Sequence, residues 1–570
     1  MHGFTRSRPW LATVVLSAGI AGCVGSRMSS RTSDPARASD SSRVSGSPVS
    51  VLNAAALPRT RAERTDYLET SHYADVANFL DSLKALDAPL AFGSIGKTVE
   101  GREIPYVIAS RPLVSTPEQA RATGKPIVYV QGNIHAGEVE GKEALLALIR
   151  DLVFATNTNV LDSIVLIAVP IYNADGNERF GPQERQRSEQ NGPELVGQRP
   201  NAQGLDLNRD YVKAEAPETR ASLAMLNLWD PDVFVDLHTT DGSFHGYALT
   251  YSPSLNPAAP LGDYTRTLLA ELRQRVRDRD GYETFDYGNF NDGGGREVST
   301  DSLHHGWYTY DHRPRFGTNY YGLRNRVSIL SEAFSHDPFE RRVKSTYAFT
   351  RELLSLVAEH GAELKEKTST TPSMTKGLVA TGVPIRSALP EQASSHPVRF
   401  EILERTGDSA RTQPGVPRGI RRTGEIRTRP MPVFDRFVPT LERPVVGEYL
   451  ISGRDTATVR RLALHGVPAR SLGGEPLPRS LEEFVVDSVV RASRPFQGHL
   501  ETRTFGHWTP VPVGTTIDDL YVVDAVARAP LVMYLLDPES DDSFGTWDVF
   551  GTRLTMGVHP VRRVVLRRFR

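Results

Sequence analysis

Four short segments of this 570-residue chain carry the residue types that could do chemistry. They supply two histidines and a glutamate that could hold a metal, two arginines and an asparagine that could bind an anion, and a second glutamate that could act as a base. This inventory is typical of a zinc hydrolase that cuts next to a free carboxylate. In chain order the segments are Ile134–Glu138, Arg199–Arg209, Val235–His238 and Ser328–Glu332.

His135 and Glu138 form an HxxE pair that follows a predicted strand and precedes a predicted helix. Zinc accepts imidazole nitrogen and carboxylate oxygen, and a catalytic zinc site combines three protein ligands with a water. A spacing of three residues places both side chains on one side of a turn. A second copy, His360-Gly-Ala-Glu363, lies near the end of a long predicted helix without a preceding strand. We interpret that copy as a solvated helix surface, so context rather than spacing favours His135 and Glu138.

The candidate third ligand is His238, which follows the apolar strand Val233–Leu237. Open α/β sheets build their sites at strand ends, and this position favours His238 over the other histidines nearby. No HExxH motif is present, which excludes the thermolysin-type arrangement. The competing histidines are His245, His304, His305, His312 and His336.

The elements that must position these residues follow from the apolar pattern. Apolar strands alternate with helical stretches between residues 126 and 334, which predicts a sheet buried on both faces. The fold class is therefore α/β, a mixed sheet flanked by helices. The predicted strands are Ile127–Val130, Ile164–Val169, Val233–Leu237 and Val327–Leu330, with a hairpin from Gly93 to Pro105, and the predicted helices lie within Tyr67–Leu86, Leu145–Leu152 and Pro338–Lys367.

We expect residues 63–367 to form the catalytic domain, 368–379 a linker, and 380–570 a smaller β-rich accessory domain. The C-terminal part consists of short apolar runs broken by Pro and Gly, which are typical of strands. Three of these runs are Pro444–Ile451, Leu520–Val526 and Leu531–Leu536.

The N-terminus resembles the signal of a bacterial lipoprotein. Basic residues precede an apolar run from Trp10 to Ile20, and small residues lead to Cys23, the only cysteine. The run is too short to span a bilayer but suits a secretory signal. We therefore expect a signal peptide over 1–22, lipidation of Cys23, a flexible tether over 23–62, and an exported protein anchored to a bacterial membrane. Val24, which is not an aspartate, favours the outer membrane.

The composition of the chain limits the kinds of partner that the protein is expected to bind. Lys and Arg number 67 and Asp and Glu 68, so the net charge of −1 gives no support to nucleic acid binding. A hydrophobic content of 39% supports a folded core and is too low for an integral membrane protein.

Between residues 63 and 365 the chain resembles the zinc carboxypeptidase A/B family. The resemblance is carried by His135-x-x-Glu138, Asp206-x-Asn208-Arg209, His238 and Glu332, which occur in the family's order. The segment Gly96–Arg102 also looks like the N-terminal region of the family. The resemblance implies a zinc carboxypeptidase-like fold for this part of the chain.

For binding, the resemblance implies that His135, Glu138 and His238 hold one Zn²⁺. Asp206 would accept a hydrogen bond from His135 and so fix its tautomer. The side chains of Asn208 and Arg209 would bind the terminal carboxylate of a peptide, to which a planar guanidinium is well matched.

For catalysis, the resemblance implies that Glu332 is the general base acting on a zinc-bound water. Arg199 would stabilise the oxyanion, with Arg185 and Arg187 as competitors. Tyr321 would be a mobile tyrosine that closes over the substrate, with Tyr320 as the alternative.

The expected function is therefore that of a zinc metallocarboxypeptidase acting on peptides with a free C-terminal carboxylate. One alternative is a zinc amidase or deacylase of the same fold that acts on cell-wall peptides or other amides. Another is a binding protein without catalysis. No GxSxG elbow supports a serine hydrolase, and we interpret the glycine-rich segment Asn291–Arg296 as a loop that borders the cleft.

Overall fold

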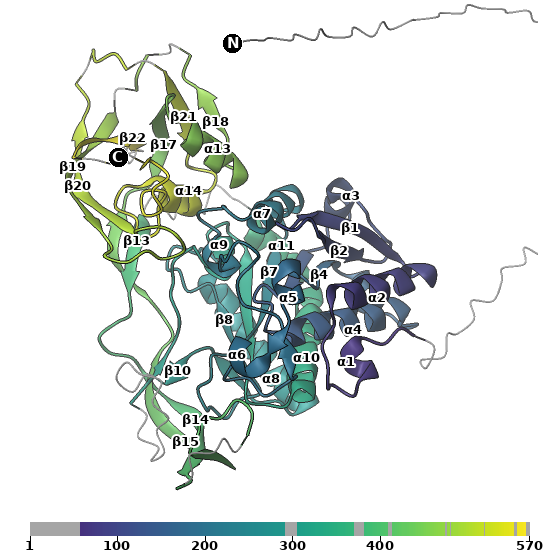
Figure 1. Ribbon diagram of the computed structural model, residues 1–570. Coiled ribbons are helices and arrows are strands. Elements are labelled where there is room, and N and C mark those ends of the chain that lie inside the picture. The colour runs from purple at the N-terminus through teal and green to yellow at the C-terminus, as the bar shows by residue number, and fades with distance from the viewer. Residues whose placement is uncertain are drawn as a thin grey trace, which may run out of the picture. The chain divides into compact units, whose positions relative to one another are not determined.

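A mixed sheet of eight strands forms the centre of the computed structural model, in the order β1-β2-β4-β3-β7-β12-β8-β9 (Figure 1). The four strands β4, β3, β7 and β12 run parallel to one another. β2 and β8 run antiparallel to their neighbours in this group, β4 and β12. β1 runs antiparallel to β2, and β9 runs parallel to β8. The bounds are β1 Leu90–Lys97, β2 Glu103–Ala109, β3 Ile127–Gly132, β4 Val165–Val169, β7 Val233–Thr239, β8 Leu249–Pro253, β9 Thr284–Asp286 and β12 Val327–Ala333.

Helices cover both faces of this sheet, which explains why its central strands are apolar throughout (Figure 1). Successive residues of β3 face opposite layers: Val128 and Val130 pack on one side, and Ile127 and Tyr129 on the other. The first face packs against α2 Tyr73–Ala85, α4 Glu140–Phe154, α8 Gly262–Asp280, α10 Phe339–Glu359 and α11 Gly361–Thr368, and the second against α7 Pro217–Trp229 and α9 Gly317–Gly322.

The region after residue 381 is rich in β-strands. β17, β18, β19, β20, β21 and β22 form a six-stranded sheet, β13 pairs with β16, and the long hairpin β14–β15 joins β10 and β11 in a four-stranded sheet. The bounds are β10 Asn289–Phe290, β11 Trp307–Tyr308, β13 Val383–Ala388, β14 Ser395–Arg405, β15 Ile420–Phe434, β16 Val438–Arg443, β17 Val446–Ser452, β18 Ala469–Ser471, β19 Leu481–Arg491, β20 Thr502–Pro510, β21 Leu520–Asp524 and β22 Gly557–Val565.

The remaining elements are short and lie mostly in connections. They are α1 Arg61–Arg64, α3 Pro117–Ala122, η2 Val160–Asp162, α5 Ala174–Glu178, β5 Gly181–Pro182, α6 Gln183–Gln186, β6 Leu195–Val196, η3 Leu207–Arg209, α13 Thr456–Leu464 and α14 Ala529–Leu536.

The predicted fold class is confirmed, with two corrections at the level of elements. Leu531–Leu536, predicted as a strand, is helical. The prediction was wrong because all of these side chains are buried, and a uniformly apolar run has no periodicity that distinguishes a helix from a strand. The helix predicted over Pro338–Lys367 is two helices that meet at His360.

The structure describes residues 57–290, 305–369, 381–407, 413–473 and 476–565, apart from Arg479, Val513, Asp518, Thr552, Arg553 and Thr555. The signal peptide, Cys23, the segment Asn291–Arg296, His304 and most of the linker therefore lie outside the described residues. No helix in the described ranges is long and apolar enough to cross a membrane. The chain from Ala56 onward forms one compact unit, so the catalytic and C-terminal regions pack together.

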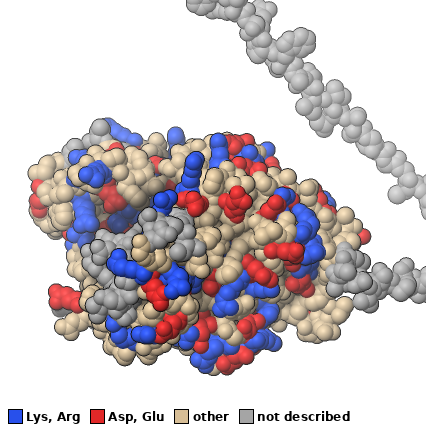
Figure 2. All heavy atoms as spheres, turned by 60° about the horizontal axis from the view of Figure 1, so that its bottom comes forward, with Lys and Arg blue, Asp and Glu red and all other residues tan. Residues whose placement is uncertain are grey.

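Charged side chains of both signs are interspersed on the face that Figure 2 shows. This distribution agrees with the balanced composition of the chain and gives that face no strong field of one sign.

Candidate metal centre and substrate pocket

The three predicted ligands come from two neighbouring strands of the sheet. His135 and Glu138 lie in the loop between β3 and α4, and His238 lies near the carboxyl end of β7. β3 and β7 are adjacent and parallel, so their carboxyl ends open at the same edge. Gly137, between the two loop ligands, has no room for a side chain, since a Cβ there would lie 2.9 Å from the carbonyl oxygen of Gly197.

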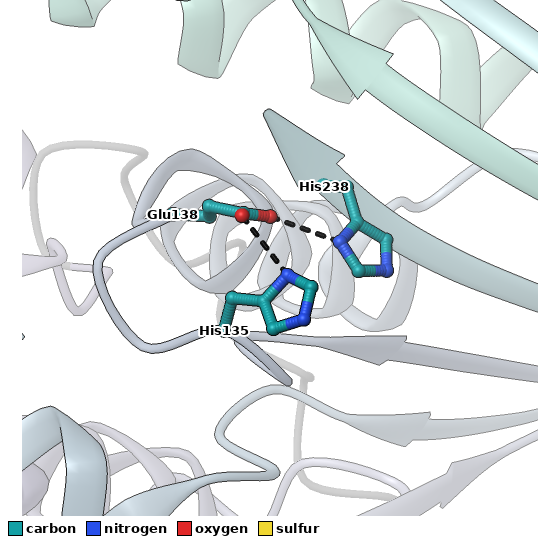
Figure 3. A group of neighbouring side chains, drawn as sticks. All are labelled: His135, Glu138 and His238. Atoms are coloured by element: carbon teal, nitrogen blue, oxygen red, sulfur yellow. Dashed lines mark hydrogen bonds and ion pairs between the residues drawn. The ribbon is translucent and has the colours of Figure 1, made fainter. Parts of the chain in front are cut away.

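The ligand atoms face one another in a buried cluster (Figure 3). His135 Nδ1 lies 3.0 Å from Glu138 Oε1, and His238 Nδ1 lies 2.9 Å from Glu138 Oε2. One ligand atom from each residue lies within 4.8 Å of the others. Two imidazoles and a carboxylate converging in this way fit the donor set of a catalytic zinc ion, which leaves a fourth position for water or substrate.

A carboxylate lies on the far side of each imidazole. His135 Nε2 lies 2.9 Å from Asp206 Oδ1, as predicted for Asp206. His238 Nε2 lies 3.1 Å from Asp236 Oδ2. The hydrogen bond to Asp206 holds the proton of His135 on Nε2 and leaves its Nδ1 free for a metal. The contact between His238 and Asp236 is an ion pair without hydrogen-bond geometry. Asp236 was not predicted, although its position two residues before His238 on one strand places both side chains on the same face.

Arg187 contacts the candidate metal ligand Glu138 and does not stand at an open position for an oxyanion. Its side chain is buried, and Nη1 donates to Glu138 Oε1 at 3.0 Å while Nη2 donates to the carbonyls of Thr239 and Thr240. Burial alone would raise the pKa of Glu138, but the neighbouring His135 and Arg187 hold this pKa well below its usual range. The carboxylate is therefore kept ionised, as a metal ligand must be.

Arg199 lies at the pocket and keeps 34% of its side chain exposed. Nε donates to Asp206 Oδ2 at 3.0 Å, and Nη1 lies 3.4 Å from Glu138 Oε1. Of the three arginines considered, Arg185 is exposed and does not line the pocket, and Arg187 is enclosed. Arg199 therefore stays our candidate for contact with a developing negative charge.

Asn208 and Arg209 project into the same pocket from the turn η3. Asn208 Oδ1 accepts a hydrogen bond of 2.9 Å from the backbone N–H of Gly317, which leaves its amide group directed toward His238. The Arg209 guanidinium stands 3.9 Å above the ring of Phe316. This cation–π contact holds the guanidinium plane at the pocket wall without using its hydrogen-bond donors.

Glu332 completes the pocket from the next parallel strand. In the register of β12 and β7 it lies directly beside His238. Its side chain is buried, and Oε2 has no hydrogen-bond partner among the described residues. Burial raises the pKa of Glu332 well above its usual value. A carboxyl group that is buried and lacks a full set of partners is costly, which is typical of a group retained for chemistry.

The structure does not bring Tyr321 to the pocket. Its side chain is fully buried against Phe234, and its hydroxyl donates to the carbonyl of Pro231. Tyr320 also points away, with its hydroxyl on His465 Nδ1 at 2.8 Å. Tyr321 faces the sheet because α9 covers this face, and Tyr320 faces Tyr211 and His465 instead.

Other residues occupy the pocket that sequence reasoning did not assign. Tyr287, Tyr310 and Asp241 line it, and no spacing relative to the four motifs marked them. Asp241, three residues after His238, is the only one that a motif-centred search would have met. The full lining is His135, Glu138, Arg199, Asn208, Arg209, His238, Thr239, Asp241, Tyr287, Tyr310, Phe316, Leu330 and Glu332.

The chain is similar in sequence and fold to known proteins. Residues 76–313 match the zinc carboxypeptidase family model. The match contains the three ligands and the Asp206–Arg209 segment, and Glu332 lies beyond its end. The residues of the His-Glu-His cluster therefore all lie within the range that matches the carboxypeptidase family model.

Curated relatives carry carboxypeptidase names. The chain is 23% identical over 520 residues to "Carboxypeptidase 2" of Trichophyton rubrum, covering 83% of this chain and 82% of that one. It is 30% identical over 148 residues to "Probable carboxypeptidase 2" of Arthroderma benhamiae, covering 25% of this chain and 24% of that one. It is 33% identical over 159 residues to "Carboxypeptidase D" of Mus musculus, covering 25% of this chain and 10% of that one. The two matches of 30% identity or more thus cover a quarter or less of the length of each relative.

Among solved structures, the chain is similar to a metallo-carboxypeptidase from Burkholderia cenocepacia, with a TM-score of 0.39 and 17% identity, covering 51% of this chain and 70% of that one. A metallo-carboxypeptidase from Pseudomonas aeruginosa, in complex with (2-guanidinoethylmercapto)succinic acid, gives a TM-score of 0.36 and 16% identity, covering 53% and 70%.

Proposed function

We propose that this protein is a zinc metallocarboxypeptidase, which hydrolyses the C-terminal bond of peptides with a free α-carboxylate. The observation that carries the proposal is that one pocket combines three kinds of group: a His-Glu-His cluster, a buried carboxyl group beside it, and an Asn-Arg pair. The family match over residues 76–313 and the names of the relatives support it.

His135, Glu138 and His238 would hold one zinc ion, which would supply a Lewis acid and lower the pKa of a water. The guanidinium of Arg209 and the amide of Asn208 would bind the substrate's terminal carboxylate and so fix which bond lies at the centre. Arg199, which like Arg209 lies beside Asp206, would donate to the oxygen that becomes negative.

Glu332 would take a proton from the attacking water and deliver it to the leaving amine. Its position beside His238 in the sheet register supports this role, because the base must lie within hydrogen-bond reach of a water at the metal cluster.

We further propose that the protein is exported and anchored by a lipid on Cys23. The tether predicted over 23–62 would be shorter at its C-terminal end, because Ala62 in α1 is buried within the compact unit. The basic, apolar and small-residue pattern of the first 23 residues supports this proposal.

The test uses one peptide in two forms, with a free C-terminal carboxylate and with a C-terminal amide. We expect the full chain to release the last residue of the free form, to lose activity with a chelator, and to regain it with zinc. The amide should be cut at least about a hundredfold more slowly, as expected when a charge-assisted contact is missing. Equal cleavage of both forms would support a zinc amidase instead, and cleavage of neither would contradict the proposal.

A further inference from the structure

Arg315 is a buried cation of the catalytic region, and among the described residues its guanidinium donates hydrogen bonds only to the C-terminal region. Its side chain is 2% exposed. Nε and Nη2 donate to Asp542 Oδ1 at 3.1 and 2.9 Å, and Nη1 donates to Glu501. The ring of Trp547 lies 4.4 Å from the guanidinium carbon. Asp542 also accepts the backbone N–H of Arg315 at 2.7 Å, so the C-terminal region holds the main chain here as well as the side chain.

The two residues after Arg315 shape the proposed carboxylate-binding pair. Phe316 carries the guanidinium of Arg209 on its ring, and the N–H of Gly317 holds the side-chain oxygen of Asn208. The path from Asp542 to the substrate pocket therefore runs through one buried ion pair and the next two residues of the same loop.

A second contact reaches the other side of the pair. Gln497, in the loop between β19 and β20, accepts the backbone N–H of Asp206 at 2.8 Å. His499 in the same loop lies 3.0 Å from the Glu215 carboxylate. The C-terminal region thus touches the chain immediately before Asn208 and again shortly after Arg209.

We propose that the C-terminal region supports the substrate pocket from behind without lining it, and that Asp542, acting through Arg315, is the positioning residue that sets the place of Asn208 and Arg209. This inference rests on the proposed binding of the substrate carboxylate by that pair. A buried guanidinium that has lost its fork partner cannot stay where it is without cost, so the loop from Arg315 to Gly317 must move.

The experiment measures equilibrium binding rather than turnover. In the full, zinc-loaded chain carrying Glu332→Gln, we would titrate one peptide as the free carboxylate and as the amide by calorimetry. The variants added to this background are Asp542→Asn, the milder Glu501→Gln, and Asp435→Asn. The last is the matched control, because Asp435 forms a 3.1 Å ion pair between the same two regions, with Arg266, but does not line the substrate pocket. Zinc content and melting temperature are recorded for each protein.

We expect Asp542→Asn to weaken binding of the free carboxylate by about tenfold to a hundredfold, the loss of a charge-assisted contact, and to leave amide binding and zinc content unchanged. Glu501→Gln should reduce the preference for the free carboxylate over the amide to a smaller degree. Asp435→Asn should not change this preference. Equal loss for both peptides, or retained discrimination in both Asp542→Asn and Glu501→Gln, would overturn this inference and leave the proposed function intact. If Asp542→Asn fails to fold, the result with Glu501→Gln decides. Absence of discrimination before either change would instead overturn the assignment of Asn208 and Arg209, and with it both proposals.

Discussion

The two HxxE pairs of this chain share their internal geometry and differ in their surroundings. In the first, His135 Nδ1 lies 3.0 Å from Glu138 and Nε2 lies 2.9 Å from Asp206. In the second, His360 Nδ1 lies 3.3 Å from Glu363 and Nε2 lies 3.2 Å from a carboxylate of α8, that of Glu271. Both histidines therefore stand between two carboxylates.

The difference lies in burial and in a third ligand. The side chains of His135 and Glu138 are 4% and 3% exposed, and His238 joins them, whereas those of His360 and Glu363 are 33% and 47% exposed. No metal-binding cluster that includes His360 occurs among the described residues. The motif at the mouth of the parallel sheet gains a buried third ligand from the next strand, whereas the motif at the helix junction gains only a half-exposed carboxylate, that of Glu271. The comparison shows that the fold, not the spacing, makes the site.

The largest effect should come from the base. We expect Glu332→Gln to keep zinc and lower kcat by about a hundredfold to ten-thousandfold, as for loss of a general base. Glu363→Gln, at the second HxxE pair, should leave kcat unchanged. Steady-state kinetics with a free-carboxylate peptide measures both. A Glu332→Gln enzyme with wild-type kcat would remove Glu332 from the mechanism.

Each HxxE histidine has a second carboxylate at its Nε2, Asp206 for His135 and Glu271 for His360. We expect Asp206→Asn to weaken zinc binding by about tenfold to a hundredfold, because the far-side carboxylate orients the imidazole of His135 and raises its basicity. Glu271→Gln removes the equivalent contact of His360 and should not change zinc affinity. Competition with a chromogenic chelator gives the two dissociation constants, and equal values for Asp206→Asn and wild type would contradict the role of Asp206.

Buried histidines should also make the free energy of unfolding depend on pH. We expect this effect, for each histidine, to be smaller than those of the preceding variants. The pKa values of His465 and His559 are lowered to about 3 by burial. The unfolded state therefore binds protons that the folded state refuses, and the free energy of unfolding should decrease as pH falls from 6.5 toward 3. The slope is about 1.4 kcal/mol per pH unit and histidine.

Asn at either position keeps an acceptor for the local donor, the Tyr320 hydroxyl or the Val561 N–H. His465→Asn should therefore reduce the acid sensitivity between pH 6 and 5, and the double variant with His559→Asn should reduce it about twice as much, since distant sites add. Urea unfolding at the two pH values measures this. An unchanged slope in the double variant would show that these histidines do not resist protonation.

Most of the central fold could be predicted from the sequence, because buried parallel strands are continuous apolar runs. β3, β4, β7 and β12 were recognisable for this reason. The helix α14 was not, since burial on every side removes the period that distinguishes a helix. The partner of each strand depends on contacts distant in sequence, so the register that places Glu332 beside His238 required the structure.

The metal cluster was predictable and the pocket wall was not. His135, Glu138 and His238 adjoin strands, and a strand end has a fixed place in a sheet. Tyr321 was misplaced because a tyrosine on a short helix has no such anchor, and the side of α9 that faces the core decides its direction. Arg315 and Asp542 could not be paired from the sequence, since 227 positions separate them.

The most direct test of the central claim is the zinc stoichiometry of three proteins: the wild type, the variant His135→Ala, and the double variant His360→Ala/Glu363→Ala. Mass spectrometry of the dialysed full chains gives the metal content. We expect one zinc per chain in the wild type and in the double variant, and none in His135→Ala. Zinc retained by His135→Ala, or lost from the double variant, would contradict the assignment of the site to His135, Glu138 and His238.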